Sequence, residues 1–509
     1  MRPYRWLPAL ALTMTTVTSP LAAQRGAGTI TLREAASPFV AFNVWVRIGS
    51  QHDPRGKEGL AALAANLLAN GSTTADPYDA ILTKLYPMAA GYGYAVDKEM
   101  TVFRGRVHRD NLDAYYALFR NALLSPAFSD DDFQRVKTQT VNFLERGRRY
   151  SRDEELSREL LSWLSFRDTP YQHPEEGYVQ SVESITLDDV KAFYRSHYLR
   201  GAVVVGVAGG YPDGFAEQVR RDFDALPAGE APAVAQPAPA RPTGTKVLIV
   251  EKPTDATAIS IGFPYDLVRG HDDFFPLMAA NAWFGEHRNS FSHLYQVIRE
   301  ARGMNYGDYS YIEAFPVAYT TQEPPVNAAR RRHLFEIWIR PISRTGPDDL
   351  HDRALFATRA ALREFTRLVD GGMTDATLAD TKGYLHNFSV TYGSTVSRRL
   401  AYAVDDAFYG LGNPGYLGAI RPALAGLTTQ GVNAAVRRHL RTSDLYIVFI
   451  TQDAEALKRK LLSGEATPIG YSGTKSPEHM AEDAEIARFP IAVRAEDITI
   501  VGINEVFEK

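Results

Sequence analysis

The chain has 509 residues, of which 45% are hydrophobic and 23% charged, and its 56 basic and 60 acidic residues give a formal net charge of −4. This length exceeds what one hydrophobic core normally supports, so we expect two or more domains. The charge balance argues against a general nucleic-acid binder, and the absence of cysteine excludes disulfides, a thiol nucleophile and a cysteine-bound zinc.

The N-terminus is typical of a signal peptide. Arg2 and Arg5 accompany the start of an apolar stretch, and the small residues Ala22 and Ala23 offer a cleavage site. We therefore predict a signal peptide over residues 1–23 and a periplasmic or secreted mature protein. The alternative is a single membrane anchor, which the shortness of the apolar stretch disfavours. No later segment of the sequence is predicted to span a membrane.

A segment rich in proline and alanine, residues 227–244, divides the mature chain into two parts of similar size. Proline disrupts helix interiors and central strands, so this composition predicts a semi-rigid linker. We therefore expect one domain over residues 24–226 and a second over residues 245–509.

The two parts resemble each other at their ends. Residues 185–198 and 427–440 share Thr, Val, Ala, Arg and His at matching places without a gap, and the shared Thr is suited to cap a helix. An apolar strand follows in each part, at residues 202–208 and 445–451. The common order of helix and strand favours an internal duplication.

Apolar periodicity predicts further strands and helices in both parts. Mixed strands and helix pairs predict α+β domains. The polar stretch 472–486 is expected to form a surface loop. In chain order, the predicted strands are 39–48, 101–107, 247–250, 259–263 and 334–339, and the predicted helices are 111–124, 130–146 and 350–368.

Several short motifs resemble those of the pitrilysin (insulinase) family of zinc metallopeptidases. They are G-S-Q-H-D-P at residues 49–54, K-E-G-L-A at 57–61, L-L-A-N-G-S at 67–72, the strand at 101–107, and Y-Q-H-P at 171–174. The likeness covers nearly all of the mature chain. It implies two homologous halves, each a mixed and mostly antiparallel sheet covered by helices.

In that family the next helix carries H-x-x-E-H, whose histidines bind zinc and whose glutamate is the general base. This chain departs from the motif, with Ala62 and Asn66 at the histidine positions and Ala65 at the glutamate position. The family's third ligand, a glutamate on a later helix, corresponds to Asn142, and Glu145 lies one turn away. A catalytic zinc needs three protein ligands, so we expect no zinc and no other cofactor in this chain.

The rest of the sequence offers no clear replacement for the missing ligands. None of the 12 histidines is followed by another four residues later. Glu286, His287 and His293 gather near one predicted helix start, either as a metal site or as a solvated helix end. We favour the solvated helix end.

A second family motif is intact. Residues 292–306 contain an apolar helix that ends near Arg299, then Gly303, then Tyr306 at the start of a strand. The resemblance implies that Arg299 and Tyr306 reach a zinc site in the other half or in another subunit, where they bind substrate carbonyls and stabilise the oxyanion. The alternative is structural, with an arginine at a helix C-terminus, a glycine cap and a tyrosine that begins a strand.

Together these features predict the non-zinc subunit of a heterodimeric metallopeptidase. The resemblance implies a zinc-bearing, pitrilysin-like partner subunit that holds the metal, and peptide substrates that bind as an added strand along a sheet edge. The alternative is a catalytically dead pseudo-peptidase that binds peptides or has a structural role. Nucleic acid is not an expected partner, and neither is a membrane beyond the signal peptide.

Overall fold

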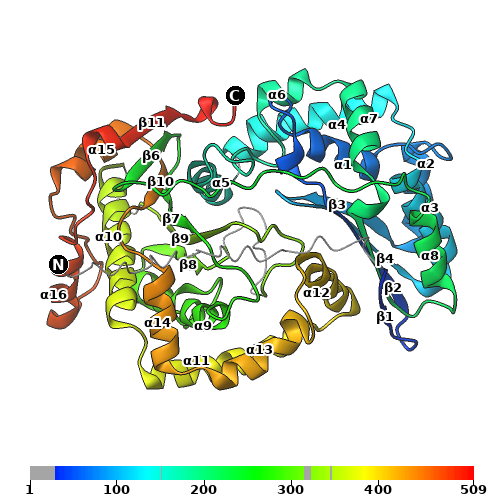
Figure 1. Cartoon of the computed structure of the whole chain (residues 1–509). Helices are drawn as coiled ribbons and strands as arrows, with labels where there is room; N and C mark the ends of the chain where they lie inside the picture. The colour runs from blue at the N-terminus through cyan, green and yellow to red at the C-terminus, as the bar shows by residue number, and fades with distance from the viewer. Residues whose placement is uncertain (1–28, 151, 314–322, 344–346) are drawn as a thin grey trace, which may run out of the picture.

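The structure is a computed structural model that describes residues 29–150, 152–313, 323–343 and 347–509. The side chains of Tyr306 and of residues 347–349 lie outside this description, as does the predicted signal peptide at residues 1–23. Figure 1 shows two halves, each built from one sheet and several helices. The α+β prediction with two homologous halves is therefore confirmed.

The first half contains a five-stranded sheet in which only the pair at one edge is parallel. Its central strand is buried on both faces, which explains the apolar run that predicted it. In spatial order the strands are β1 (Ile30–Arg33), β5 (Val203–Gly209), β2 (Phe39–Val46), β4 (Thr101–His108) and β3 (Gly91–Val96).

Most helices of the first half pack on one face of this sheet, where Phe42 and Val44 of β2 join their apolar core. The predicted helix at 130–146 is α-helical only as far as Asn142 and continues as a π-helical turn, η4 (Phe143–Arg148). The helices are α1 (Leu60–Asn70), α2 (Tyr78–Leu85), α3 (Leu112–Leu124), α4 (Asp130–Asn142), α6 (Val179–Ser184), α7 (Leu187–His197) and α8 (Phe215–Phe223).

The second half contains a six-stranded sheet. In spatial order the strands are β11 (Ile498–Gly502), β6 (Lys246–Glu251), β10 (Tyr446–Thr451), β7 (Ala258–Tyr265), β9 (His333–Pro341) and β8 (Asn305–Tyr311). Its helices are α9 (Phe274–Gly285), α10 (Pro347–Gly371), α11 (Asp375–Phe388), α13 (Gly415–Gly426), α14 (Thr429–His439), α15 (Ala454–Ser463) and α16 (Pro477–Ile486).

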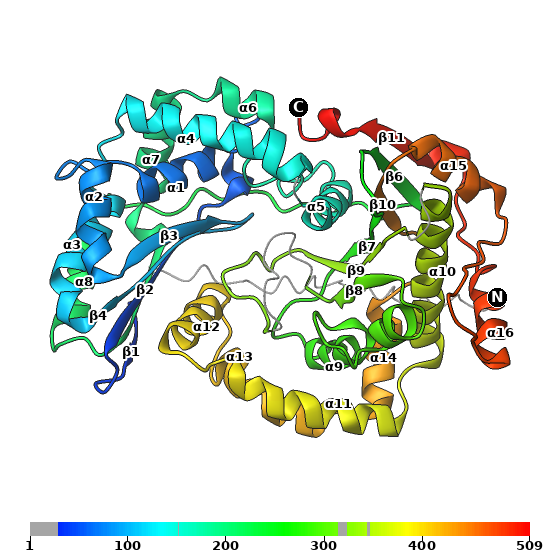
Figure 2. The same cartoon turned by 180° about the vertical axis from the view of Figure 1, so that it is seen from behind.

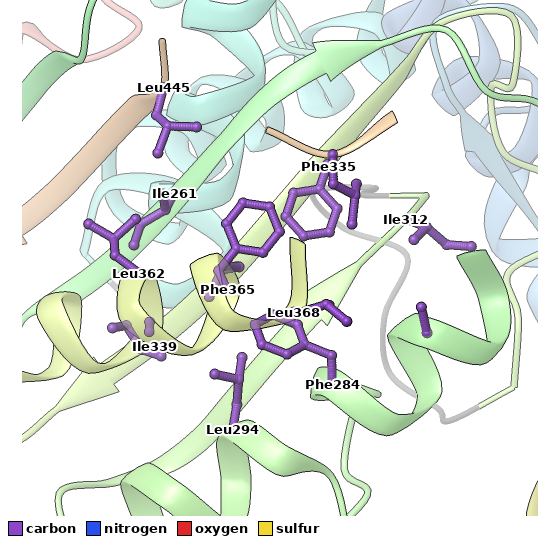
Figure 3. Packing of buried hydrophobic residues seen from close by; sticks show 14 of the residues in the cluster. Ile261, Phe284, Leu294, Ile312, Phe335, Ile339, Leu362, Phe365, Leu368 and Leu445 are labelled. Carbon is purple, nitrogen blue, oxygen red and sulfur yellow. The ribbon is translucent and has the colours of Figure 1, made fainter. Parts of the chain in front are cut away.

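The core of the second half lies between its sheet and α10. Figure 3 shows Phe335 of β9 facing Phe365 of α10, with Phe284 of α9 close by. The rings of Phe335 and Phe365 stack with their centroids 5.0 Å apart. Alternate residues of β9, such as Phe335 and Ile339, therefore point into one apolar layer, as the period-two pattern of the sequence predicts.

The two sheets share one topology. The order β1-β5-β2-β4-β3 corresponds strand for strand, and in parallel or antiparallel sense, to β6-β10-β7-β9-β8, and β11 is an addition at one edge. A pair of histidines recurs as well. The rings of His52 and His197 lie edge to face at 6.0 Å, and those of His271 and His439 do so at 5.4 Å. This repetition confirms the internal duplication.

The halves exchange one helix each. Helix α5 (Asp153–Ser165) belongs to the first half in sequence but packs on β7 and β10, while α12 (Val396–Tyr409) packs on β2 and β5. Figures 1 and 2 both show α12 beside the first sheet and α5 beside the second. Burying one large apolar side chain stabilises a fold by about 1.5–3 kcal/mol. Separating the halves would expose several such side chains on each exchanged helix and lose that stabilisation.

A buried ionic network also joins the halves. Arg330 is 1% exposed and pairs with Glu313 and Asp405, and Arg269 pairs with the same two carboxylates. The backbone N–H groups of Arg330 and of the following residue donate to Glu99 of the first half, at 3.0 and 2.7 Å. Charges removed from water need such partners, so the network requires both halves to be in place.

Two other segments bear on the sequence predictions. Residues 227–244 contain no helix or strand and run beside the first half, where His52 Nε2 lies 3.2 Å from the carbonyl oxygen of Pro232.

The prediction of a surface loop at 472–486 is wrong, because α16 occupies most of this stretch, with Ser476 capping the helix and Pro477 at its first turn. Over the described ranges, the helices are too short or too polar to cross a bilayer.

Candidate functional site

The helix that would carry the family's zinc motif is present as α1. It packs against β3 and β4 and against α3, α4 and α7. Ala62 and Ala65 are buried in this packing, and Asn66 is half-buried, with its side-chain oxygen accepting a hydrogen bond from Asn70 at 2.7 Å. These positions offer methyl groups and one amide where a zinc site needs imidazole and carboxylate, so α1 does not fit a catalytic zinc.

Asp53 holds the start of α1 in place. Its fully buried carboxylate accepts the backbone N–H groups of Gly59 and Ala61, each at 2.7 Å. Burial raises the pKa of Asp53, and these two hydrogen bonds oppose that rise. His173 of the Y-Q-H-P motif lies 3.9 Å from the same carboxylate. The G-S-Q-H-D-P and Y-Q-H-P motifs therefore lie next to each other at the start of α1.

Gly59 is required at this helix start. Its φ is +99°, and a Cβ built on it would lie 2.4 Å from the carbonyl oxygen of Glu176. A larger residue would both strain the backbone and push the neighbouring loop away. The backbone at the start of α1 is thus fixed by Asp53 and Gly59, whereas Ala62, Ala65 and Asn66 offer no imidazole or carboxylate.

Asn142, at the position of the third ligand, is the last residue of α4 and is exposed. Helix α4 lies beside α1, as the resemblance requires. Glu145 falls within the π-helical turn that follows and is half-buried. A carboxylate is therefore close to Asn142 in sequence, but α1 has no histidine that could bind a metal together with it.

Two groups of three potential metal ligands occur among the described residues, and neither includes a residue of α1. In the first, His271 and His439 flank Asp273. Arg438 donates to both oxygens of Asp273, at 2.7 and 2.9 Å. An arginine that already neutralises the carboxylate disfavours a cation there.

The second group consists of Glu159, Glu175 and Glu176. Arg148 pairs with Glu159 and Glu176, and Lys98 pairs with Glu175 at 2.8 Å. Each carboxylate of this group thus already pairs with a basic side chain of the protein.

The cluster considered in the sequence, Glu286, His287 and His293, does not form one site. His287 Nδ1 lies 2.8 Å from the hydroxyl of Tyr311, whereas His293 Nε2 lies 2.7 Å from Glu364. Glu286 accepts a hydrogen bond from the asparagine three residues later, at 3.1 Å. Each member has a partner of its own, so the three do not form a metal site. The solvated helix end that the sequence analysis favoured is wrong, because His287 is buried and the other two are half-buried.

Arg299 lies in a π-helical turn, η6 (Tyr295–Glu300), with its guanidinium carbon 4.6 Å from the centre of the Tyr295 ring. Its carbonyl accepts the N–H of Gly303 at 2.6 Å, and Gly303 has a φ of +60°, which is the left-handed cap that the spacing predicts. Burial raises the pKa of Asp308 in β8, and the hydrogen bond from Asn305 and the charge of Arg299 oppose that rise. The turn that carries Arg299 packs against β8.

Tyr306 lies in β8, within an irregular stretch where the register with β9 shifts between Asn305 and Asp308. Its side chain lies outside the described residues. Helix α1 and strand β8 belong to different halves of the chain, as Figures 1 and 2 show. The chain thus holds the altered zinc helix in one half and the Arg299 segment in the other.

Comparison with known proteins gives a consistent result. The family profile described as "Insulinase (Peptidase family M16)" matches residues 29–175, and that described as "Peptidase M16 inactive domain" matches residues 184–384. Together the two matches span more than half of the chain.

Among curated proteins, an uncharacterized zinc protease of Bacillus subtilis is 23% identical over 278 residues, which cover 54% of this chain and 65% of that protein. The mitochondrial-processing peptidase subunit alpha of Caenorhabditis elegans is 24% identical over 245 residues, which cover 45% and 46% of the two chains. Both matches span less than two thirds of the relative's length.

Among solved structures, the peptidase M16 inactive domain from Pseudomonas fluorescens is similar, with a TM-score of 0.71 and 24% identity. The alignment covers 85% of this chain and 96% of that one. This likeness supports the fold described above.

Proposed function

Because this chain belongs to the insulinase (M16) peptidase family, we propose that it is the zinc-less subunit of a heterodimeric peptidase and lends Arg299 and Tyr306 to a zinc-bearing partner. The observation that carries the proposal is that α1 keeps its place in the fold while lacking zinc-binding side chains. Asp53 and Gly59 still hold this helix in position, yet its three reactive positions are Ala62, Ala65 and Asn66.

In this proposal, the chain stabilises the negative charge that develops during hydrolysis of the peptide bond. Hydrolysis of a peptide bond passes through a tetrahedral intermediate whose oxygen carries negative charge. A tyrosine hydroxyl and a guanidinium, held in advance at that oxygen, stabilise it without reorganising, and each donor of this kind contributes on the order of 3 kcal/mol. Helix α1 and strand β8, which begins after the Arg299 turn, lie in different halves of the chain, and this supports a role for Arg299 at the active site of another chain.

The proposed substrates are peptides in an extended conformation. Strand β3 forms an edge of the first sheet and packs against α1, and β8 forms an edge of the second sheet. An edge strand offers unpaired backbone groups to which an extended peptide can add. A relative named as a subunit of a processing peptidase supports the proposal of a partner subunit.

Mixing experiments test this function. The purified chain should show no chelator-sensitive cleavage of unfolded peptides. Adding a zinc-bearing family member with an intact H-x-x-E-H motif from the same organism should give activity well above that of the partner alone. Robust cleavage by the lone chain would refute the proposal.

A second candidate is a catalytically inert protein that binds peptides or has a structural role. The observation that favours it is the local setting of Arg299, which stacks on Tyr295 and belongs to a glycine-capped turn. An arginine with such a structural role need not serve catalysis. If this candidate is correct, adding the chain does not raise the activity of a zinc-bearing partner.

We further propose that the chain is exported and that cleavage follows Ala23. The charged start and the apolar stretch after it support this proposal. N-terminal sequencing of the mature protein should then begin at Gln24. A mature protein that begins at Met1, or its recovery from the cytoplasm, would contradict export.

A further inference from the structure

A pocket with a volume of about 480 Å³ lies between the first sheet and α12. Strands β2 and β4, the segment 323–327 and the start of α12 line it. Small-molecule sites in proteins span roughly 300–1,000 Å³, so the pocket has the size of a binding site. It lies on the face of β2 that packs on α12, whereas the opposite face of β2 joins the core that contains α1.

Two buried amides in this pocket carry unused hydrogen-bonding groups. Trp45 Nε1 and Asn43 Nδ2 both donate to Asn327 Oδ1, at 2.8 and 3.4 Å. An indole N–H can only donate, so the bond from Trp45 identifies the oxygen of Asn327 and leaves its Nδ2 as a donor. Asn43 Oδ1 remains as an acceptor.

Among the residues that the structure describes, neither of these two atoms has a hydrogen-bond partner, although Asn43 is only 3% exposed and Asn327 8% exposed. The hydroxyl of Ser397, which also lines the pocket, is buried and has no partner within the same described ranges. A buried polar group without a partner costs about 1–3 kcal/mol. One donor and one acceptor in the same pocket match the C=O and N–H that a single residue of an extended peptide presents on one side.

Arg104 stands next to these amides. It is directly opposite Asn43 in the register of β2 and β4, so the two side chains project from the same face with their Cβ atoms roughly 5 Å apart. Arg104 lines the pocket and pairs with no carboxylate among the described residues. Arg398, by contrast, pairs with Glu323 at 2.5 Å. The pocket therefore offers an uncompensated positive charge beside the amide pair.

We propose that this pocket binds the carboxy-terminal end of a peptide. Asn43 Oδ1 accepts the N–H of the last peptide group, Asn327 Nδ2 donates to a carbonyl oxygen, and Arg104 pairs with the terminal carboxylate. A chain end is favoured because its amide and carboxylate are adjacent, as Asn43 and Arg104 are. This site does not depend on the zinc-bearing partner, so it can be tested on the lone chain.

Fluorescence anisotropy with three labelled decapeptides of glycine, serine and alanine tests the proposal. The first peptide has a free terminal carboxylate, the second is amidated, and the third is amidated and contains one internal glutamate. We expect the first to bind at least about tenfold more tightly than the other two, the scale of about 1.4 kcal/mol for one lost charged contact. Equal binding of the first two peptides would overturn the proposal. Tight binding of the third would also overturn it, because the carboxylate recognised would then be an acidic side chain.

Variants assign the binding to this pocket. Arg104→Gln should weaken binding of the free-acid peptide at least about tenfold, whereas Arg221→Gln, at an exposed position on α8, should leave it unchanged. Asn327→Asp keeps the oxygen that Trp45 requires but replaces the free donor with a second acceptor, so it should abolish binding. Arg104 is exposed, so its variant should fold normally. Unchanged binding in Arg104→Gln would refute the site.

Discussion

Trp45 donates its indole N–H to the side-chain oxygen of Asn327 over 2.8 Å, and this hydrogen bond joins β2 of the first half to the segment that precedes β9 of the second. The Trp45 ring also packs edge to face on Phe408 of α12, with the centroids 4.7 Å apart. One fully buried residue of the first half therefore contacts two separate parts of the second.

The first prediction concerns this link. Trp45→Phe should lower the free energy of unfolding by about 1–3 kcal/mol, because the buried oxygen of Asn327 loses its better donor and the smaller ring leaves space. Urea unfolding followed by circular dichroism measures the change. Asn327 has a φ of +60°, so Asn327→Gly is the suitable partner in a double-mutant cycle. A coupling energy of about 0.5 kcal/mol or more is expected, and strictly additive effects would show that the contact is inconsequential.

The second prediction concerns the metal. After dialysis the purified chain should hold far less than one zinc per molecule, because Ala62 and Ala65 present only methyl groups and Asn66 is engaged with Asn70. Elemental analysis measures the zinc content, and a zinc-bearing family member prepared in the same way is the control. One tightly held zinc per chain would contradict the prediction. The group formed by His271, Asp273 and His439 would then be the first site to test.

The third prediction concerns Tyr306 in the reconstituted pair. Tyr306→Phe removes only a hydroxyl, so kcat should fall by roughly 100-fold while KM changes little, the behaviour of a donor used in the transition state. Tyr86→Phe, at a residue that is 87% exposed in the first half, is the matched control and should leave kcat unchanged. Steady-state kinetics measure both, and size-exclusion chromatography verifies that the pair still forms.

Arg299→Lys extends the same test. A lysine keeps the charge but cannot reproduce the planar donor fork, so kcat should again fall. If kcat were unchanged for both Arg299→Lys and Tyr306→Phe in an intact complex, the two residues would be structural. The inert binding protein would then be the better description.

The fourth prediction concerns acid stability. Burial lowers the pKa of His287 to about 3, with the positive charges of Arg158 and Arg288 acting in the same direction. The unfolded chain binds this proton near pH 6.5, so the stabilising contribution is complete above that pH and is lost as the pH falls toward 3. From pH 7 to pH 5 the loss from this one residue should be about 2 kcal/mol.

His287→Asn isolates that contribution. The free energy of unfolding, measured by urea titration at pH 7 and pH 5, should change less for the variant than for the unmodified protein. Equal pH dependence in the variant and the unmodified protein would show that His287 is protonated as readily in the folded state as in the unfolded one.

Local pattern was sufficient for several central strands. Strands β2, β5 and β10 are apolar runs because they are buried on both faces, and that property is readable without knowledge of their neighbours. The edge strands are different. Strand β3 reads Gly-Tyr-Gly-Tyr-Ala-Val, and only pairing with β4 makes it a strand. The helix α16 was missed although Ser476 and Pro477 form a helix-start signal.

The candidate sites divide in the same way. The altered zinc motif is a matter of residue identity at Ala62, Ala65 and Asn66, and it stays a prediction made from the sequence. The pocket beside α12 was not predicted, since Asn43 and Asn327 are 284 positions apart. The one signal was a polar residue, Asn43, in the middle of an apolar strand.

By itself, therefore, the sequence determined the α+β class and the duplicated halves, because both are readable from apolar patterns and motifs along the chain. Only the tertiary structure decided that the halves exchange α5 and α12, and that Arg330 is buried between Glu313 and Asp405. Those features depend on contacts between distant segments. Their stability comes from removing apolar and charged groups from water together, which no local pattern specifies.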